Sequence, residues 1–203
     1  YEGYGLSECA SVVSLNNPFH NKPGSVGKVL PHAKVRISDE GEIIVGGQSM
    51  LGYLGLGDIN KSQSNQEVHT GDLGHMDSEG FLYISGRKKN LIVSSFGRNI
   101  SPEWVESEIQ QAQQITQVAI FGDAKPWLSA VVTPAPSSTK EEIEQVIQAC
   151  NQRMPDYAQI KTWLVGEQDF SAENKQLTEN GRLRRDTIFA QYQVQLDELY
   201  DCA

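Results

Sequence analysis

The pattern of apolar residues changes once along this chain of 203 residues, just after Gly86. Before that point, most of the 18 glycines separate short stretches in which apolar and polar residues alternate, such as 34–37 and 42–45. Alternation with a period of two is typical of strands with one buried face, and glycine pairs between such stretches mark turns. Residues 1–86 are therefore predicted to form a β-rich unit of short strands and many turns.

Beyond Arg87 the spacing becomes helical. Val105, Ile109 and Ala112 stand at i, i+4 and i+7 after a proline, which predicts a helix from residue 102. The capping-box pattern of 139–142 predicts a second helix, which extends to residue 150. The other elements expected here are strands over 118–121, 128–133 and 160–165 and a final amphipathic helix over 184–200. Helices that alternate with strands predict a compact α+β or α/β module, with the boundary between the two parts near 86–89.

Composition excludes several classes of protein. The chain has 26 acidic and 17 basic side chains, a net charge of −9, which argues against a general binder of nucleic acids or anionic membranes. Anionic small molecules stay possible, because a pocket can be locally basic. Three well-separated cysteines fit a reducing compartment, so we expect a cytoplasmic protein. The sequence opens at Tyr1, inside a glycine-rich phrase, and is expected to be a piece of a longer chain.

The first candidate site lies at this glycine-rich start. Gly3 and Gly5 flank Tyr4, so the backbone can approach a flat ligand closely, and Ser7 and Glu8 follow. A serine hydroxyl can donate to a phosphate, and a carboxylate can hold Mg²⁺ beside it. Taken by itself, the segment is better explained by a glycine turn with an exposed Ser-Glu pair.

The second candidate is Asp72, which is expected to stand in a glycine turn after an extended stretch. A carboxylate in that position can accept both hydroxyl groups of a ribose. Thr-Gly-Asp is also a common turn composition, so a plain turn is the alternative.

The third candidate is the junction, where Arg87, Lys88 and Lys89 stand together and Gly97 follows in a polar turn. Arg87 can reach a ribose or a phosphate, and Gly97 can let a thin substrate pass along the backbone. A solvated linker is the usual meaning of such a run of charges.

The fourth candidate is Arg182, which follows the strong turn pair Asn180-Gly181 and is expected at an exposed tip. An arginine at such a tip suits phosphate or carboxylate contact, and its alternative is a basic cap before the last helix. The histidines show no metal-ligand spacing, and no GxSxG motif supports a serine hydrolase.

In order and spacing these segments resemble the back portion of the adenylate-forming enzymes: acyl-CoA synthetases, peptide-synthetase adenylation domains and firefly luciferase. The segments that carry the resemblance are 4–8, 41–47 with 51–53, 70–73, 86–93 with 97–106, and 180–185. The phrases Arg-Lys-Lys-Asn-Leu-Ile and Asn-Ile-Ser-Pro-Glu are most similar to long-chain fatty-acyl-CoA synthetases. The resemblance covers nearly the whole chain.

The resemblance implies an α+β fold in two parts. Residues 1–86 correspond to the C-terminal subdomain of the large AMP-binding domain, a β-rich and distorted barrel-like unit. Residues 87–90 correspond to a hinge, and 91–203 to a small α/β C-terminal lid domain. The implied reaction joins a fatty acid to CoA with ATP, through an acyl-adenylate, and releases AMP and pyrophosphate.

The resemblance also implies roles for the first segment. Gly3, Tyr4 and Gly5 correspond to the nucleotide-binding phrase, in which Gly3 and Tyr4 face the adenine of ATP or AMP. Ser7 corresponds to a contact of the α-phosphate, and Glu8 to a ligand of the Mg²⁺ that bridges the triphosphate.

Further roles follow for the other segments. Asp72 corresponds to the residue that holds the ribose diol, with Arg87 close by, and Lys89 to the hinge residue. Gly97 corresponds to a glycine that lines the pantetheine tunnel of CoA. Arg182 replaces the family's catalytic lysine, and we hypothesise slower adenylation because arginine is bulkier and planar.

The implied partners are a fatty acid, ATP, CoA and the N-terminal part of the parent chain, which carries the phosphate loop and the acyl tunnel; the parent can also associate with a membrane. Two alternatives stay open: a ligase that loads a carrier protein or another acceptor, and a non-catalytic homologue marked by Arg182. The isolated piece is expected to show no turnover.

Overall fold

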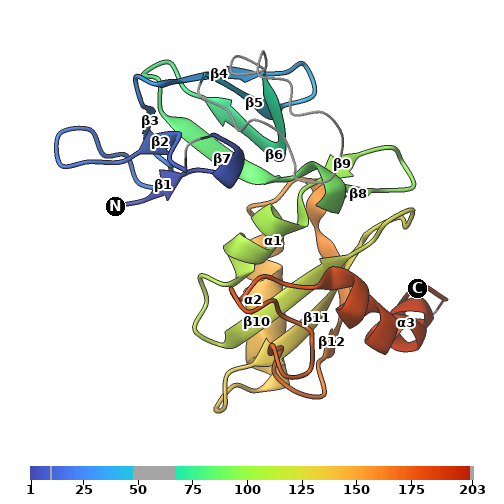
Figure 1. Ribbon diagram of the computed structural model, residues 1–203. Coiled ribbons are helices and arrows are strands. Elements are labelled where there is room, and N and C mark those ends of the chain that lie inside the picture. The colour runs from blue at the N-terminus through green and yellow to red at the C-terminus, as the bar shows by residue number, and fades with distance from the viewer. Residues whose placement is uncertain (10, 48–66, 202–203) are drawn as a thin grey trace. The chain divides into compact units, whose positions relative to one another are not determined.

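The computed structural model describes residues 1–9, 11–47 and 67–201, so the expected segment 51–53 lies outside the described residues. The chain divides into two compact units, Tyr1–Lys89 and Asn90–Ala203 (Figure 1). The division falls inside the segment 87–90 that joins the two sequence patterns. Each unit has its own hydrophobic core.

The described residues of the first unit form two antiparallel sheets. Four strands pair in the order β4 (Ala33–Ile37), β5 (Glu42–Gly47), β6 (Val68–Met76) and β7 (Leu82–Arg87). Three short strands form the second sheet: β1 (Gly3–Tyr4), β2 (Ser14–Leu15) and β3 (Lys28–Val29). An antiparallel bridge between Lys28 and Phe81 connects the two sheets beside β7. The β-rich, barrel-like character predicted from the sequence is confirmed.

Strand β5 differs from its predicted pattern. Its first four residues, Glu42 to Val45, are all buried, although alternation had indicated one buried face. One face packs in the core of the first unit through Ile43 and Val45, and on the other face Glu42 is buried against polar groups of β6. A buried glutamate in this strand must find polar partners, because an uncompensated buried charge is costly.

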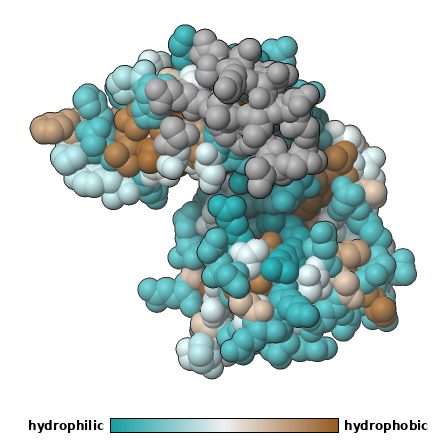
Figure 2. All heavy atoms as spheres, in the orientation of Figure 1, coloured by the Kyte–Doolittle hydropathy of each residue, from teal (hydrophilic) through white to brown (hydrophobic). Residues whose placement is uncertain are grey.

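The second unit is a three-layer α/β arrangement. Its sheet has the order β10 (Ile115–Phe121), β11 (Leu128–Pro134) and β12 (Ile160–Val165). β10 and β11 are antiparallel, and β11 and β12 are parallel. Helices α1 (Pro102–Ile109) and α2 (Lys140–Asn151) pack on one face, and α3 (Arg185–Asp201) packs on the other (Figure 1). The face of this unit shown in Figure 2 is mostly hydrophilic, since the apolar side chains lie between the layers.

The short elements of the chain are the hairpin strands β8 (Ile92–Val93) and β9 (Asn99–Ile100) and the 3-10 turns η1 (Ser7–Cys9), η2 (Lys88–Asn90) and η3 (Asp156–Ala158). Of the helices in the described ranges, none combines the length and the apolar character needed to cross a bilayer.

The helix boundaries follow local sequence signals with one exception. The predicted capping box of α2 is confirmed: the Glu142 N–H donates to Thr139 Oγ1 at 3.2 Å, and the Thr139 N–H donates to Glu142 Oε2 at 2.9 Å. The prediction that Ala112 continues the first helix is wrong, because α1 ends at Ile109. The Ala112 N–H instead donates to the Ile109 carbonyl in a tighter turn, which leads the chain into β10.

Candidate functional site

A nearly buried carboxylate forms the centre of the candidate site. Asp72 lies in β6, and its side chain is 9% exposed. The Tyr4 hydroxyl donates to Asp72 Oδ2 at 2.6 Å, and Arg87 Nε lies 2.6 Å from Asp72 Oδ1. Tyr4 comes from β1, and Arg87 stands opposite Asp72 on β7. The structure therefore brings three of the predicted site residues together from three strands.

A bulge in β6 sets the position of Asp72. Between the pairs Ile44↔His69 and Glu42↔Leu73, β6 has two more residues than β5, and Gly71 has a φ of +69°. A positive φ favours glycine, and a bulge redirects the neighbouring side chains. The Asp72 N–H donates to Thr70 Oγ1 at 3.0 Å, which stabilises this local conformation. The prediction of a glycine turn after a strand is wrong, because β6 continues through the bulge to residue 76.

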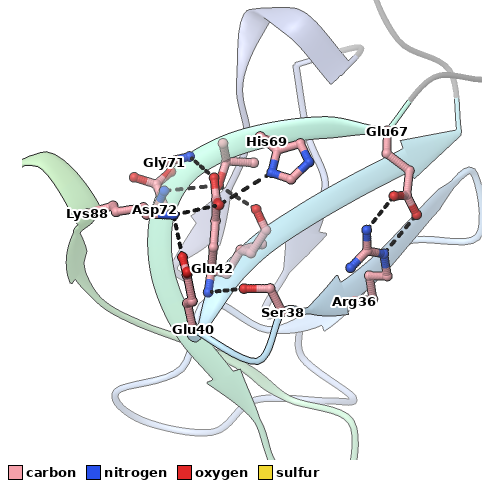
Figure 3. Close-up of polar contacts among 11 residues, drawn as sticks. Arg36, Ser38, Glu40, Glu42, Glu67, His69, Gly71, Asp72 and Lys88 are labelled. Carbon is pink, nitrogen blue, oxygen red and sulfur yellow. Dashed lines mark hydrogen bonds and ion pairs between the residues drawn. The ribbon is translucent and has the colours of Figure 1, made fainter.

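Glu42 supports the same bulge from β5, and the sequence interpretation had placed it only in a strand. Its Oε1 accepts the Gly71 N–H at 3.1 Å, and its Oε2 lies 3.3 Å from His69 Nδ1 and 3.5 Å from Lys88 Nζ (Figure 3). Lys88 also pairs with Glu40 at 2.6 Å. A signal for this role was present in the sequence, namely a glutamate at the start of an apolar stretch.

The charge state of Glu42 follows from these partners. Burial raises the pKa of the carboxyl. The hydrogen bonds from His69 and the Gly71 N–H, together with the nearby charge of Lys88, lower the pKa by more than burial raises it, so the net pKa lies below its usual value. Glu42 is therefore an anion at neutral pH. It holds the bulge and pairs with a cation of the junction.

An open cavity of about 450 Å³ lies beside the bulge in the first unit. It is lined by Glu42, His69, Thr70, Gly71, Arg87, Lys88 and Lys89. Three consecutive cations and polar backbone groups suit a ligand that carries hydroxyl groups and negative charge.

The glycine-rich start differs in detail from what its composition indicated. Gly3 and Tyr4 lie in β1, paired with β2. A Cβ at Gly5 would collide with the Ser11 carbonyl, so chain packing requires glycine there. Ser7 and Glu8 lie in η1, where Ser7 is exposed and Glu8 is half-buried.

The remaining predicted site residues lie in the second unit. Gly97 has a φ of +72° in the turn between β8 and β9, and a Cβ added there would meet no atom within 4 Å. Arg182 is exposed in a tight turn, in which the Thr178 N–H donates to the Arg182 carbonyl at 2.8 Å. Gly181 has a φ of +75° there, as the Asn-Gly pair predicts. The predicted exposed tip at Arg182 is confirmed.

The bond between Tyr4 and Asp72 gives a first prediction. Burial and the hydrogen bond to Asp72 raise the pKa of Tyr4 well above its ordinary value, so its hydroxyl stays a donor. Tyr4→Phe is expected to lower the free energy of unfolding by about 1.5–3 kcal/mol, the range for a hydrogen bond to a charged group. Scanning calorimetry of the chain measures this loss.

Tyr83→Phe is the matched control, since it removes a longer bond of 3.4 Å to Asp77. We expect a loss less than half as large. Equal losses from the two variants would contradict a strong Tyr4–Asp72 bond.

Comparison with known families assigns the second unit. Residues 89–203 match the family model of the AMP-binding enzyme C-terminal domain. The chain therefore belongs to the AMP-binding enzyme family, and the predicted resemblance to adenylate-forming enzymes is confirmed.

Curated relatives and solved structures agree with this assignment. The long-chain-fatty-acid–CoA ligase FadD15 of Mycobacterium bovis is 29% identical over 99% of this chain, which spans 38% of the length of that relative. The anthranilate CoA ligase AuaEII, in complex with anthranoyl-AMP, has the same fold, with a TM-score of 0.76 and 20% identity over 96% of this chain and 40% of its own. The O-succinylbenzoate CoA synthetase of Bacillus subtilis, in complex with AMP, is 26% identical, with a TM-score of 0.72 over 91% of this chain and 40% of its own.

Proposed function

We propose that this chain is the C-terminal part of an ATP-dependent acyl-CoA synthetase that activates a fatty acid. Family membership and the long-chain-fatty-acid–CoA ligase relatives support the class of reaction. The observation that carries the proposal for these residues is the Asp72 carboxylate, held between the Tyr4 hydroxyl and Arg87. An anchored, charged acceptor beside a cationic cavity is what a ribose diol linked to phosphates requires.

The proposed reaction has two half-reactions. In the first, a carboxylate oxygen of the fatty acid attacks the α-phosphorus of ATP, and pyrophosphate leaves. In the second, the CoA thiolate attacks the acyl carbon of the adenylate, the carbon–oxygen bond to the phosphate breaks, and AMP leaves. The protein acts chiefly by positioning the reactants and by stabilising charge on the phosphates.

Residues of the first unit bind the nucleotide in this proposal. Asp72 accepts the ribose hydroxyls, and Arg87 keeps the carboxylate oriented from the opposite strand. The Tyr4 ring faces the adenine, and the Ser7 hydroxyl donates to the α-phosphate.

Glu8 suits Mg²⁺ in this proposal. Mg²⁺ takes oxygen ligands and usually binds through one or two carboxylates together with phosphates and waters. Glu8 offers a half-buried carboxylate one residue after Ser7, so the donor chemistry fits. When bound, the ion neutralises negative charge on the triphosphate. Glu8 itself orients that end of the nucleotide relative to Ser7.

In the proposed mechanism, the second unit moves between the two half-reactions. A rotation at Lys89 presents Arg182 for adenylation and the turn at Gly97 for thioester formation. Gly97 can serve there because it has no side chain and the position of a Cβ is open, so the pantetheine arm can pass close to the backbone.

Arg182→Lys gives a second prediction. In the full-length parent, lysine at this exposed tip is expected to raise the rate of ATP–pyrophosphate exchange by a few-fold to about tenfold, because an ammonium is a compact point charge and a guanidinium is planar and bulky. The second half-reaction, started from a supplied acyl-adenylate, is expected to keep its rate. An unchanged exchange rate would show that arginine serves adenylation as well as lysine does.

The acceptor of the acyl group is tested directly on the full-length parent. Purified protein with ATP, Mg²⁺ and a series of fatty acids is assayed for AMP release with free CoA and with a phosphopantetheinylated carrier protein. We expect AMP release with CoA. Release only with the carrier protein would support a carrier-loading ligase instead, and no ATP turnover with any carboxylate would support a non-catalytic homologue.

A further inference from the structure

A buried ionic cluster lies at the start of α3 in the second unit, outside the candidate nucleotide site. Glu106 is 5% exposed, and the side chain of Arg185 is 16% exposed. Arg185 Nη2 lies 2.5 Å from Glu106 Oε2, and its Nη1 lies 3.2 Å from Glu103 Oε1. One guanidinium therefore joins a buried carboxylate, Glu106, to a second one, Glu103, whose side chain is 32% exposed.

The cluster connects the three layers of the unit. Glu106 and Glu103 belong to α1, and Arg185 is the first residue of α3, which packs on the opposite face of the sheet. They meet at β10, which is an edge strand of the sheet among the described residues. There the Ile120 N–H donates to Glu106 Oε1 at 3.0 Å. Arg185 thus ties the two helix layers together at the β10 edge.

On one side, the cluster adjoins the hairpin that carries Arg182. The Arg184 N–H donates to the Gln176 carbonyl at 2.8 Å at the base of this hairpin, and Leu177 bridges to Leu183 within it. Both leucines pack on the apolar cluster beneath α3. Because Arg185 follows this base directly, its position fixes the end of the hairpin.

On the other side, the cluster reaches the residue that follows Lys89. Asn90 Nδ2 donates to Glu103 Oε1 at 2.5 Å, on the same oxygen that Arg185 contacts. A continuous polar path therefore runs from Asn90 through Glu103 to Arg185 within one unit.

We propose that Arg185 is a positioning residue for adenylation, which fixes the Arg182 hairpin to the chain segment that leaves Lys89. This inference rests on the proposed function, in which a rotation at Lys89 delivers Arg182 to the nucleotide. The rotation places a side chain accurately only if the hairpin moves rigidly with the segment at the hinge. Buried ion pairs contribute little net stability compared with apolar side chains, so this one is better explained by the geometry that it defines.

The test uses Arg185→Lys in the full-length parent. Lysine keeps the positive charge beside Glu106, so the unit can fold, but it cannot contact both carboxylates through a planar fork. The matched control is Lys125→Met, which removes another ion pair of α3, between Lys125 and Asp197 at 3.0 Å, far along the helix from Arg185.

Three readouts are compared with wild type: ATP–pyrophosphate exchange, thioester formation from a supplied acyl-adenylate and CoA, and amide hydrogen exchange of the hairpin. For Arg185→Lys we expect a loss of about tenfold or more in pyrophosphate exchange, and thioester formation within about twofold. We expect faster hydrogen exchange at the amides of Thr178, Arg182 and Arg184, which donate within the hairpin. Lys125→Met is expected to leave all three readouts within about twofold of wild type.

If Arg185→Lys lowered pyrophosphate exchange and thioester formation equally, in proportion to a loss of thermal stability, the proposal would be overturned. Such a result would indicate that Arg185 has a structural role without positioning. Unchanged hydrogen exchange in the hairpin would also overturn it. If the wild-type parent turned over no ATP, the proposed function would fail, while the hydrogen-exchange comparison would still decide whether Arg185 fixes the hairpin.

Discussion

Asp72→Asn in the full-length parent is expected to lower kcat/KM for ATP by about two orders of magnitude, mainly through a higher KM. A hydrogen bond to a charged acceptor contributes roughly 1.5–3 kcal/mol, and the ribose diol makes two such bonds in the proposed complex. The amide keeps one acceptor oxygen but turns an NH₂ group toward Arg87 or Tyr4, both of which donate to the carboxylate.

2′-Deoxy-ATP separates a ribose contact from general damage. Wild type is expected to discriminate against it by about tenfold or more, and Asp72→Asn is expected to lose most of that discrimination. Asp77→Asn is the matched control, because Asp77 belongs to a different polar network of the first unit. In that network, Lys22 Nζ lies 2.7 Å from Asp77 Oδ2. A similar loss of ATP affinity in both variants, or unchanged discrimination in Asp72→Asn, would contradict the assignment of Asp72.

Glu106→Gln is expected to change how stability depends on pH. Burial, the largest influence, raises the pKa of Glu106 from its usual 4.5 to about 7, in spite of Arg185 and the Ile120 N–H. The folded state then holds this proton more tightly than the unfolded state does. The resulting stabilisation is fully present below about pH 4.5 and is lost as the pH rises through about 7.

The free energy of unfolding of wild type, relative to Glu106→Gln, should therefore fall by on the order of 3 kcal/mol between about pH 4.5 and pH 8. All three tryptophans, Trp104, Trp127 and Trp163, lie beyond residue 90, so tryptophan fluorescence in denaturant reports the second unit. Glu108→Gln, on the same helix, serves as the control and should follow the wild-type profile. Parallel profiles of wild type and Glu106→Gln across this range would show that burial does not raise the pKa of Glu106.

Local signals in the sequence predicted much of the fold. The capping box at Thr139 and the Asn-Gly turn before Arg182 involve residues three or four apart, so the sequence contains the whole interaction. The same locality explains the errors. Gly71 favours a positive φ in a turn and in a bulge alike, and only the pairing of β6 with β5 decides between them.

The centre of the site depends on contacts that no local pattern shows. Tyr4 and Asp72 are 68 residues apart, and Arg185 and Glu106 are 79 residues apart. Local patterns and the family resemblance named Tyr4, Asp72 and Arg87, but they did not show that the Tyr4 hydroxyl and Arg87 both hold the Asp72 carboxylate. They missed the support from Glu42 and the link from Arg185 to Glu106, because each needs the register of a sheet or the packing of layers.

The most direct test of the proposed function is fatty-acid-dependent exchange of labelled pyrophosphate into ATP by the full-length parent without CoA. We expect exchange that requires both the fatty acid and Mg²⁺, together with net AMP release once CoA is added. Formation of ADP and phosphate, or no exchange with fatty acids of any chain length, would contradict the proposal that this chain is part of an AMP-forming acyl-CoA synthetase.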